Sequence, residues 1–345
     1  MGGGPAKHGE VTPVLDGLSF DLRAKVVRRR QPSWVTPMLA TLTDRHFSSR
    51  DWVYERKLDG VRCLVFRRGR SVQLLSRNRL SMNARYPELV EALERLPARD
   101  FVADGEVVAF AGRETSFALL QGRIGRRSPI SARSSGITVT LHLFDLLHVD
   151  GYDLTQLPLL ARKDVLRRSV AFDETVRRVA HRREHGERYL ADACRHGWEG
   201  LIAKRAAATY QHGRSRDWLK FKCGRRQELV IGGFTEPRAT RTGFGALLVG
   251  YWEDGRLRYA GKVGTGYDDE TLRTLRRELD RLERPSRPFS ERTGLPVKGV
   301  HWVAPELVAE VGFTEWTADG RLRHPRFLGL RTDKDPKTVT RERPA

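Results

Sequence analysis

Two strand-like runs, at residues 52–55 and 63–66, enclose the hexapeptide Lys57-Leu58-Asp59-Gly60-Val61-Arg62. Alternation of apolar residues is typical of a strand with one buried face. The hexapeptide therefore predicts a lysine at a strand end, beside a glycine turn and an arginine, where its amine can attack a phosphorus atom. The alternative is an ordinary hairpin in which Lys57 contacts solvent and Gly60 adopts a positive φ.

Short strand-like runs continue from residue 34 to about residue 222, separated by a few helices. Residues 101–103 and 106–110 flank Asp104-Gly105, which predicts a strand, a tight turn and a second strand. Residues 138–145 alternate, with Phe144 on the strand face opposite to Leu141 and Leu143. Strands that are mostly not parallel, with helices packed on them, predict an α+β fold.

After residue 224 the chain becomes rich in short strands punctuated by glycine. One helix is predicted after Asp268, which can cap it, because leucines recur at helical spacing from Leu272 to Leu282. Five short strands and a helix within about a hundred basic residues predict a small β-barrel of the OB type.

The composition divides the chain into four predicted segments. They are a basic flexible N-terminal tail at residues 1–33, a core domain at 34–222, an OB-fold domain at 223–336 and a C-terminal tail at 337–345. The first tail is rich in Gly, Pro and Arg, and either contacts DNA or is a disordered leader.

The chain carries 63 Lys and Arg against 43 Asp and Glu, a net charge of +20. This excess favours a polyanionic partner such as nucleic acid, the alternative being a coding bias toward arginine. Cys63, Cys194 and Cys223 are widely spaced and odd in number, which predicts no disulfide framework or zinc site and fits a reducing cytoplasm. No apolar run approaches a membrane span and residues 1–6 lack a signal-peptide core, so no membrane is expected.

Further motifs follow the hexapeptide along the chain. They are Ser76-Arg77, Asp104-Gly105-Glu106, Leu143-Phe144-Asp145, residues 199–204, residues 218–222 and Arg331-Thr332-Asp333-Lys334. This ordered series resembles that of the ATP-dependent DNA ligases, within the lysine-nucleotidyltransferase superfamily. Pro37-Met38-Leu39-Ala40, residues 260–266 and residues 327–331 resemble the bacterial end-joining branch. The resemblance implies an α+β nucleotidyltransferase (ATP-grasp-like) adenylation core of antiparallel sheets with packed helices, followed by an OB-fold β-barrel.

Such a ligase would seal 5′-phosphate/3′-hydroxyl breaks through a covalent lysyl-AMP intermediate, with Lys57 as the nucleophile. Its amine must be neutral to attack the α-phosphorus of ATP, and Arg62, Lys220, Lys222 and a divalent metal are expected to lower its pKa. The implied cofactors are ATP as co-substrate and Mg²⁺ or Mn²⁺. Metal and fixed positive charge would stabilise each in-line displacement at phosphorus.

The resemblance also implies contacts with the nucleoside. Glu55 would read the adenine edge, and Phe144 would stack on the adenine ring. Arg62 and Arg77 would contact phosphate or the nick, whereas Asp104 would only shape its turn.

The remaining motif positions would hold metal and phosphates. Glu106 would contact ribose or metal, and Glu199 would bind metal. Lys220 and Lys222 lie two apart on one strand face, as clamping a triphosphate requires. A last group would orient the pyrophosphate leaving group, and its members are Arg331, Asp333 and Lys334.

The implied partners are nicked or broken duplex DNA and a Ku-type end-binding protein, with a monomer as the expected state and the bacterial cytoplasm and nucleoid as the location. An RNA ligase or a capping-type guanylyltransferase is the enzymatic alternative. The other alternative is a non-catalytic module that binds nucleic acid. The last motif together with Glu55 favours ATP and DNA. The argument against the module is the presence of four intact residues, Lys57, Glu199, Lys220 and Lys222.

Overall fold

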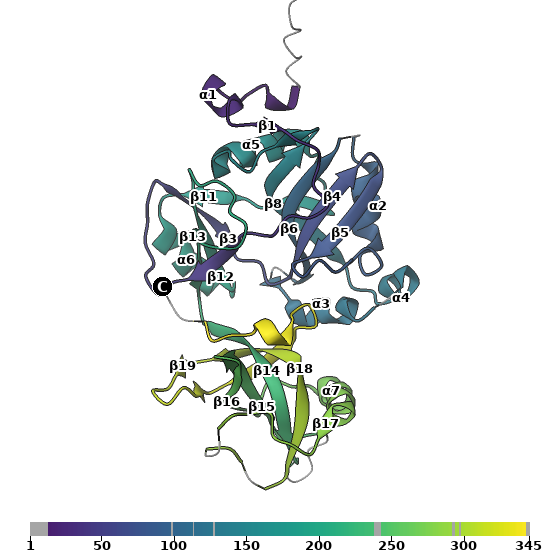
Figure 1. The fold of residues 1–345 in the computed structure, drawn as a ribbon, viewed down its shortest axis with the longest axis vertical. Coiled ribbons are helices and arrows are strands. Elements are labelled where there is room, and N and C mark those ends of the chain that lie inside the picture. Colours follow the sequence, from purple (N-terminus) through teal and green to yellow (C-terminus); the bar gives the residue numbers. More distant parts are fainter. Residues whose placement is uncertain are drawn as a thin grey trace, which may run out of the picture.

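The computed structural model describes residues 13–97, 99–112, 114–126, 128–237, 243–291, 294–296 and 298–342. Within these residues three larger sheets, of eight, five and six strands, form the two lobes seen in Figure 1. The first two sheets lie in the upper lobe and the third in the lower lobe. Helices pack on strands that are mostly antiparallel, which agrees with the predicted α+β class. Among the described residues no helix is both long enough and apolar enough to span a membrane.

The eight-stranded sheet has its main path in the order β1-β9-β8-β6-β4-β5, with β10 beside β8 and β7 beside β6. One face buries an apolar core that includes Leu74, Leu89 and Leu141. The strands are β1 (Val27–Arg28), β4 (Val61–Arg68), β5 (Ser71–Ser76), β6 (Phe101–Ala111), β7 (Glu114–Thr115), β8 (Val139–Val149), β9 (Tyr152–Asp153) and β10 (Val176–Arg178). Its accompanying helices are α2 (Pro87–Arg95), α3 (Phe117–Ile124), α4 (Pro129–Arg133) and α5 (Leu159–Ser169).

The five-stranded sheet has the order β11-β3-β12-β13-β2. Its strands are β2 (Leu39–Leu42), β3 (Trp52–Arg56), β11 (His181–Arg183), β12 (Gly200–Arg205) and β13 (Arg214–Lys222), with helix α6 (Gly186–Arg195) packed on one face. A cluster that joins Leu64, Phe144 and Trp218 brings side chains of both upper-lobe sheets together. Phe144 therefore does lie on the strand face opposite to Leu141 and Leu143, as the alternation predicted.

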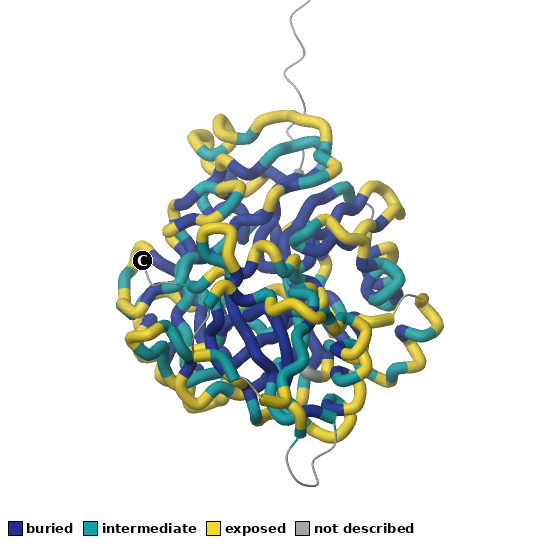
Figure 2. Tube along the Cα trace, turned by 60° about the horizontal axis from the view of Figure 1, so that its bottom comes forward, coloured by how far each residue is buried: buried dark blue, intermediate teal, exposed yellow. Residues whose placement is uncertain are grey.

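The lower lobe is a curled sheet in the order β16-β15-β14-β18-β17, with β21 beside β18. Figure 2 looks toward this lobe and shows buried strands surrounded by more exposed chain. Asp268 caps helix α7 (Asp269–Arg281), as predicted, by accepting a hydrogen bond from the Thr271 amide. The strands are β14 (Arg225–Thr235), β15 (Leu247–Glu253), β16 (Arg256–Val263), β17 (Glu283–Arg284), β18 (Val300–Phe313) and β21 (Arg326–Leu330), and a small separate pair is β19 (Glu315–Trp316) with β20 (Leu322–Arg323).

The hexapeptide crosses from one sheet to the other and is not a hairpin. It leaves β3, which pairs with β11 and β12, and enters β4, which pairs with β5 and β6. Gly60 has no positive φ, but a Cβ there would meet the Val107 carbonyl oxygen at 2.2 Å. Glycine is therefore required for close packing, and the hairpin alternative is wrong.

The predicted turn at Asp104-Gly105 is also wrong, because both residues lie within the single strand β6. The register against β8 shifts between Asp104 and Gly105, which accommodates the irregularity without ending the strand. A Cβ on Gly105 would come within 2.8 Å of the His142 carbonyl oxygen. The Asp-Gly pair marks a close approach of two strands here.

Both predicted tails need correction. Val14, Leu15 and Leu18 are buried in the core of the upper lobe, and β1 pairs with β9, so the N-terminal segment is packed from residue 13 onward. Residues 1–12 lie outside the described residues. Two short 3₁₀ segments occur in the described chain. One is η1 (Pro13–Leu15), which helix α1 (Phe20–Arg23) follows, and the other is η2 (Pro336–Thr338), near the other end. Residues 338–342 contact both lobes, as described below.

A disulfide joins Cys194 to Cys223, contrary to the expectation from cysteine spacing. The two residues are 29 apart in sequence, and the fold brings the end of α6 beside the end of β13. Cys63 is buried and free.

Candidate functional site

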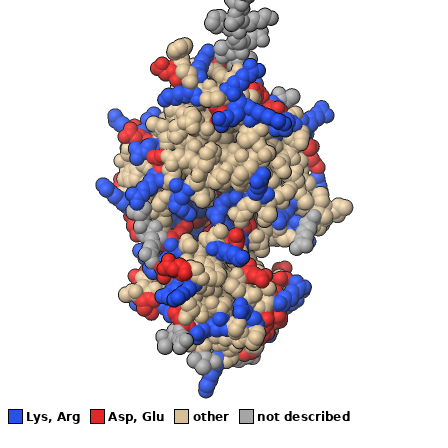
Figure 3. Space-filling view, viewed as in Figure 1, with Lys and Arg blue, Asp and Glu red and all other residues tan. Residues whose placement is uncertain are grey.

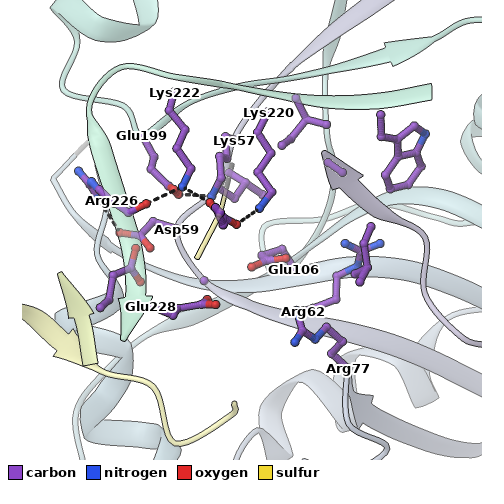
Figure 4. A pocket seen from close by; sticks show the side chains of 18 of the residues that line it. Lys57, Asp59, Arg62, Arg77, Glu106, Glu199, Lys220, Lys222, Arg226 and Glu228 are labelled. Carbon is purple, nitrogen blue, oxygen red and sulfur yellow. Dashed lines mark hydrogen bonds and ion pairs between the residues drawn. The ribbon is translucent and has the colours of Figure 1, made fainter. Parts of the chain in front are cut away.

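A cavity of about 240 Å³ opens between the two lobes, and every motif residue that was expected to contact nucleotide, metal or DNA lines it. Figure 4 shows Lys57, Lys220 and Lys222 extending into one part of it, with Arg62 and Arg77 farther along. The complete set of assigned residues at the cavity is Glu55, Lys57, Arg62, Arg77, Glu106, Phe144, Glu199, Lys220, Lys222, Arg331, Asp333 and Lys334. The structure thus brings together residues from both lobes.

Lys57 lies where β3 ends, and its amide donates a hydrogen bond to the Gly200 carbonyl at 2.9 Å. Its ammonium forms a short ion pair with the Glu199 carboxylate at the start of β12. Burial alone would lower the pKa of Lys57, but the Glu199 carboxylate raises it well above its usual range. In this arrangement Lys57 is protonated, and a reaction that uses its free amine requires the pair to separate first.

The expectation that nearby cations lower this pKa is therefore wrong for the structure. The reason is that the Glu199 carboxylate raises the pKa of Lys57 directly, while each of those cations is itself paired with a carboxylate. Arg62 pairs with Asp104, while Lys220 and Lys222 both pair with Glu342.

Glu55 is buried on β3 between two lysines that the sequence analysis did not assign. Lys163 from α5 lies 2.5 Å from one carboxylate oxygen, and Lys204 from β12 lies 2.7 Å from the other. Burial would raise the pKa of Glu55, but the two ammonium groups lower it below the usual value. The carboxylate consequently remains ionised and can only accept hydrogen bonds.

Lys204 also contacts the aromatic wall of the cavity. Its ammonium lies 4.2 Å from the centre of the Phe144 ring and 4.0 Å from that of Trp218. Burial lowers the pKa of Lys204 to about 8, against the opposing effect of Glu55. A signal for Lys204 was present in the sequence, because it is the last residue of the motif at residues 199–204 and lies on the same strand face as Ile202, which also lines the cavity. No such signal existed for Lys163, because helix α5 lies outside all of the motifs along the sequence.

Arg62 and Asp104 form a two-point ion pair beneath the cavity. The Arg62 guanidinium donates to the two Asp104 oxygens at 2.5 and 2.6 Å and to the Met38 carbonyl at 3.0 Å. The Tyr210 hydroxyl donates to the same carboxylate at 2.6 Å. Asp104 therefore fixes the direction of Arg62 and does not merely shape a turn.

Replacing Asp104 with Asn is expected to lower the free energy of unfolding by roughly 3 kcal/mol, because Arg62 would be left buried without its counter-charge. Chemical denaturation of the two proteins measures this difference. Asp44→Asn, at an exposed carboxylate, is the matched control and should change stability little. Equal, small effects of both substitutions would contradict the structural role given to the pair.

Two carboxylates at the cavity are poorly neutralised. Burial raises the pKa of Glu106 to about 7 although Arg62 opposes the shift. Burial also raises the pKa of Asp59 to about 7, and the negative charges of Glu199 and Glu310 add to this effect. Carboxylates in this state favour a divalent cation nearby, which would supply the missing positive charge.

Among the described residues, no three His, Cys, Asp or Glu side chains form a ready-made metal cluster. Proteins usually hold Mg²⁺ through one or two carboxylates together with substrate phosphates. Glu106 and Glu199 both face the cavity and so fit such a role.

The last motif ties the lower lobe to the upper lobe. Arg331 donates to both Asp333 oxygens at 2.9 Å, and its guanidinium lies 4.3 Å from the centre of the Phe117 ring on α3. Lys334 pairs with Glu228 at 2.7 Å. The Asn78 side chain donates to the Asp333 carbonyl at 3.1 Å. The structure is therefore a closed arrangement in which the last motif faces the hexapeptide across the cavity.

Glu342, which sequence analysis placed in a tail, lies in the same cavity. Its oxygens are 2.5 Å from the Lys220 ammonium and 3.0 Å from that of Lys222. Lys222 also donates to the Arg226 carbonyl at 2.7 Å. No motif pointed to Glu342, because its position depends on how the chain returns between the lobes.

Comparison with known families gives two matches along the chain. The family described as "ATP dependent DNA ligase domain" matches residues 37–222, and the one described as "ATP dependent DNA ligase C terminal region" matches residues 240–334. The chain is 37% identical over 322 residues to the multifunctional non-homologous end joining protein LigD of Pseudomonas aeruginosa, covering 91% of this chain and 37% of that protein. It is 38% identical over 318 residues to LigD of Mycobacterium tuberculosis H37Rv, covering 89% and 40%. The chain thus spans about two fifths of the length of these relatives.

Solved structures give the same picture of the fold. A structure described as mycobacterial DNA ligase D complexed with ATP and MES matches with a TM-score of 0.65 and 35% identity, covering 89% of this chain and 98% of that chain. This likeness extends over both lobes. It confirms the predicted nucleotidyltransferase core followed by an OB-fold domain.

Proposed function

This chain belongs to the ATP-dependent DNA ligases of the nucleotidyltransferase superfamily, and from that premise we propose that it seals 5′-phosphate/3′-hydroxyl breaks in duplex DNA through an AMP adduct on Lys57. The observation that supports this most directly is the convergence of the assigned residues from both lobes on one cavity around Lys57. We further propose that the reaction serves end joining in the bacterial cytoplasm.

In the first step the Lys57 nitrogen forms a bond to the α-phosphorus of ATP, and the bond from that phosphorus to the pyrophosphate oxygen breaks. The ammonium loses its proton to solvent water before or during attack, so its pair with Glu199 must separate. A divalent metal bound near Glu199 and Glu106 would neutralise charge on the phosphates. Redirecting Glu199 toward a cation would remove the interaction that keeps Lys57 protonated.

The remaining contacts assign parts of the nucleotide to parts of the cavity. Glu55, held ionised by Lys163 and Lys204, would accept a hydrogen bond from the exocyclic amine of adenine. The carbonyl that guanine carries at this position cannot donate one. Phe144 would stack on the base, and Lys220 and Lys222 would bind phosphates.

AMP would then pass from Lys57 to the 5′-phosphate of the break, and the 3′-hydroxyl would displace it. Arg62 and Arg77 line the cavity and would contact the nucleotide phosphate or the nick. A Ku-type end-binding protein as partner and a monomeric state are further parts of the proposal, and they rest on the resemblance to end-joining ligases.

Incubation with α-labelled ATP or α-labelled GTP, in the presence of Mg²⁺ or Mn²⁺, tests the proposed function. We expect label on the protein from ATP only, and transfer of that label to a nicked DNA duplex. A GMP adduct would indicate a guanylyltransferase, transfer to RNA ends alone would indicate an RNA ligase, and no adduct at all would indicate a binding module.

Binding to a nicked duplex is expected to weaken steeply with salt, by roughly 0.9 log units per log unit of salt for each phosphate neutralised. The basis is the net charge of +20, and Figure 3 shows Lys and Arg side chains on both lobes and at the waist between them. Titration of the duplex at several salt concentrations measures the slope. A flat response would contradict DNA binding through this charge.

A further inference from the structure

The segment that follows the last motif runs through the waist between the lobes, where Figure 1 draws it in yellow. The Trp252 amide donates to the Val339 carbonyl at 2.8 Å. Gln227 contacts the segment twice, by donating to the Thr340 carbonyl and accepting from the Glu342 amide, both at 3.1 Å. These contacts with the lower lobe position the backbone so that the Glu342 side chain lies in the cavity.

The Glu342 carboxylate lies between two ammonium groups on one face of β13. Its two oxygens each contact a different lysine, at 2.5 Å for Lys220 and 3.0 Å for Lys222. Burial would raise the pKa of Glu342, but the two lysines lower it to about 2, so the group is ionised at neutral pH. Two oxygens of a phosphate group could make the same pair of charge-assisted contacts.

We propose that Glu342 is an internal substitute for a nucleotide phosphate, and that it must leave Lys220 and Lys222 before ATP can bind productively. The inference rests on the proposed function, because it takes the two lysines as the phosphate contacts of ATP. The segment then restrains the enzyme in its nucleotide-free closed form. Because Glu342 contacts the upper lobe while its backbone is held by the lower lobe, it also joins the lobes directly.

Competition between Glu342 and ATP for the two lysines predicts a specific effect on the affinity for ATP and on the rate of adduct formation. The apparent affinity for ATP falls in proportion to the fraction of molecules in which the two lysines are free. The rate of adduct formation at saturating ATP stays the same, because ATP has then displaced the segment from every molecule.

The test compares Glu342→Gln with the unmodified chain. The amide keeps the shape of the side chain and removes its charge, so ATP is expected to bind roughly fivefold more tightly as the occupied fraction falls. Calorimetry gives the dissociation constant, and adduct formation gives KM, which should fall by the same factor while kcat is unchanged. Glu306→Gln, at an exposed carboxylate on β18, is the matched control and should alter neither value.

Two further measurements separate competition from general loosening of the protein. A chain ending at Arg341 lacks Glu342 altogether and should show the same gain for ATP. Adenosine has no phosphate, so its binding should be the same in all three proteins.

The inference is overturned if Glu342→Gln and the chain ending at Arg341 bind ATP as weakly as, or more weakly than, the unmodified chain. It is also overturned if adenosine binding tightens as much as ATP binding. Failure of the proposed function is distinguishable from either result, since the unmodified chain would then form no adduct from ATP at any concentration.

Discussion

Lys57→Ala is expected to abolish the AMP adduct and the sealing of ordinary nicks, with a loss on the order of a thousandfold or more because the nucleophile itself is removed. Lys57→Arg should fail equally, because a guanidinium is not deprotonated near neutral pH. Gel separation of protein incubated with α-labelled ATP measures the adduct, and a nicked duplex measures sealing.

Loss of Lys57 also leaves Glu199 buried without its partner, so the variant needs a test of its folded state. Sealing of a nick that is supplied already adenylated provides this test, because that substrate already carries AMP and its sealing does not require an adduct on Lys57. Lys25→Ala, at an exposed lysine, is the matched control and should form the adduct normally. Adduct at the normal level on Lys57→Ala would refute the assignment.

Asp333→Ala and Lys334→Ala should each slow adduct formation from ATP by roughly a hundredfold, as loss of one group that stabilises developing charge commonly does. Lys334 would be such a group itself, whereas Asp333 holds the Arg331 guanidinium in place. In the closed arrangement both residues line the cavity, and the Asn78 side chain of the upper lobe donates to the Asp333 carbonyl. DNA must enter the same region, so we expect the domain to swing away for sealing. Sealing of a pre-adenylated nick should then change only a few-fold.

Single-turnover rates from ATP and from the pre-adenylated nick test this separation. Glu270→Ala, an exposed carboxylate on α7 of the same lobe, is the control for general effects on the domain. Equal losses in both reactions would assign the motif to DNA binding or folding and would remove the basis for two positions of the OB-fold domain.

The strand faces of some assigned residues could be predicted because they depend on local pattern, whereas the other site residues were assigned from the resemblance to the ligases. Strand alternation placed Phe144 on the face away from Leu141 and Leu143, and two-residue spacing placed Lys220 and Lys222 on one face. The helix after Asp268 begins at the residue that its capping side chain indicated.

Features that depend on contacts between remote segments could not be predicted. Asp104-Gly105 looks like a turn, but tertiary contacts with Arg62 and Tyr210 keep Asp104 within a strand. The protonated state of Lys57 follows from its distance to Glu199 and from the pairing of the surrounding cations, neither of which the spacing contains. Glu342 reaches the cavity only because the chain returns between the lobes.

The measurement that tests the central claim most directly is peptide mapping of the unmodified protein after incubation with ATP and Mg²⁺. We predict a single AMP on the peptide that contains Lys57, absent from all others. Addition of excess nicked duplex should remove it as the nick is sealed. AMP on a different residue, or sealing from ATP without any adduct at Lys57, would contradict the account.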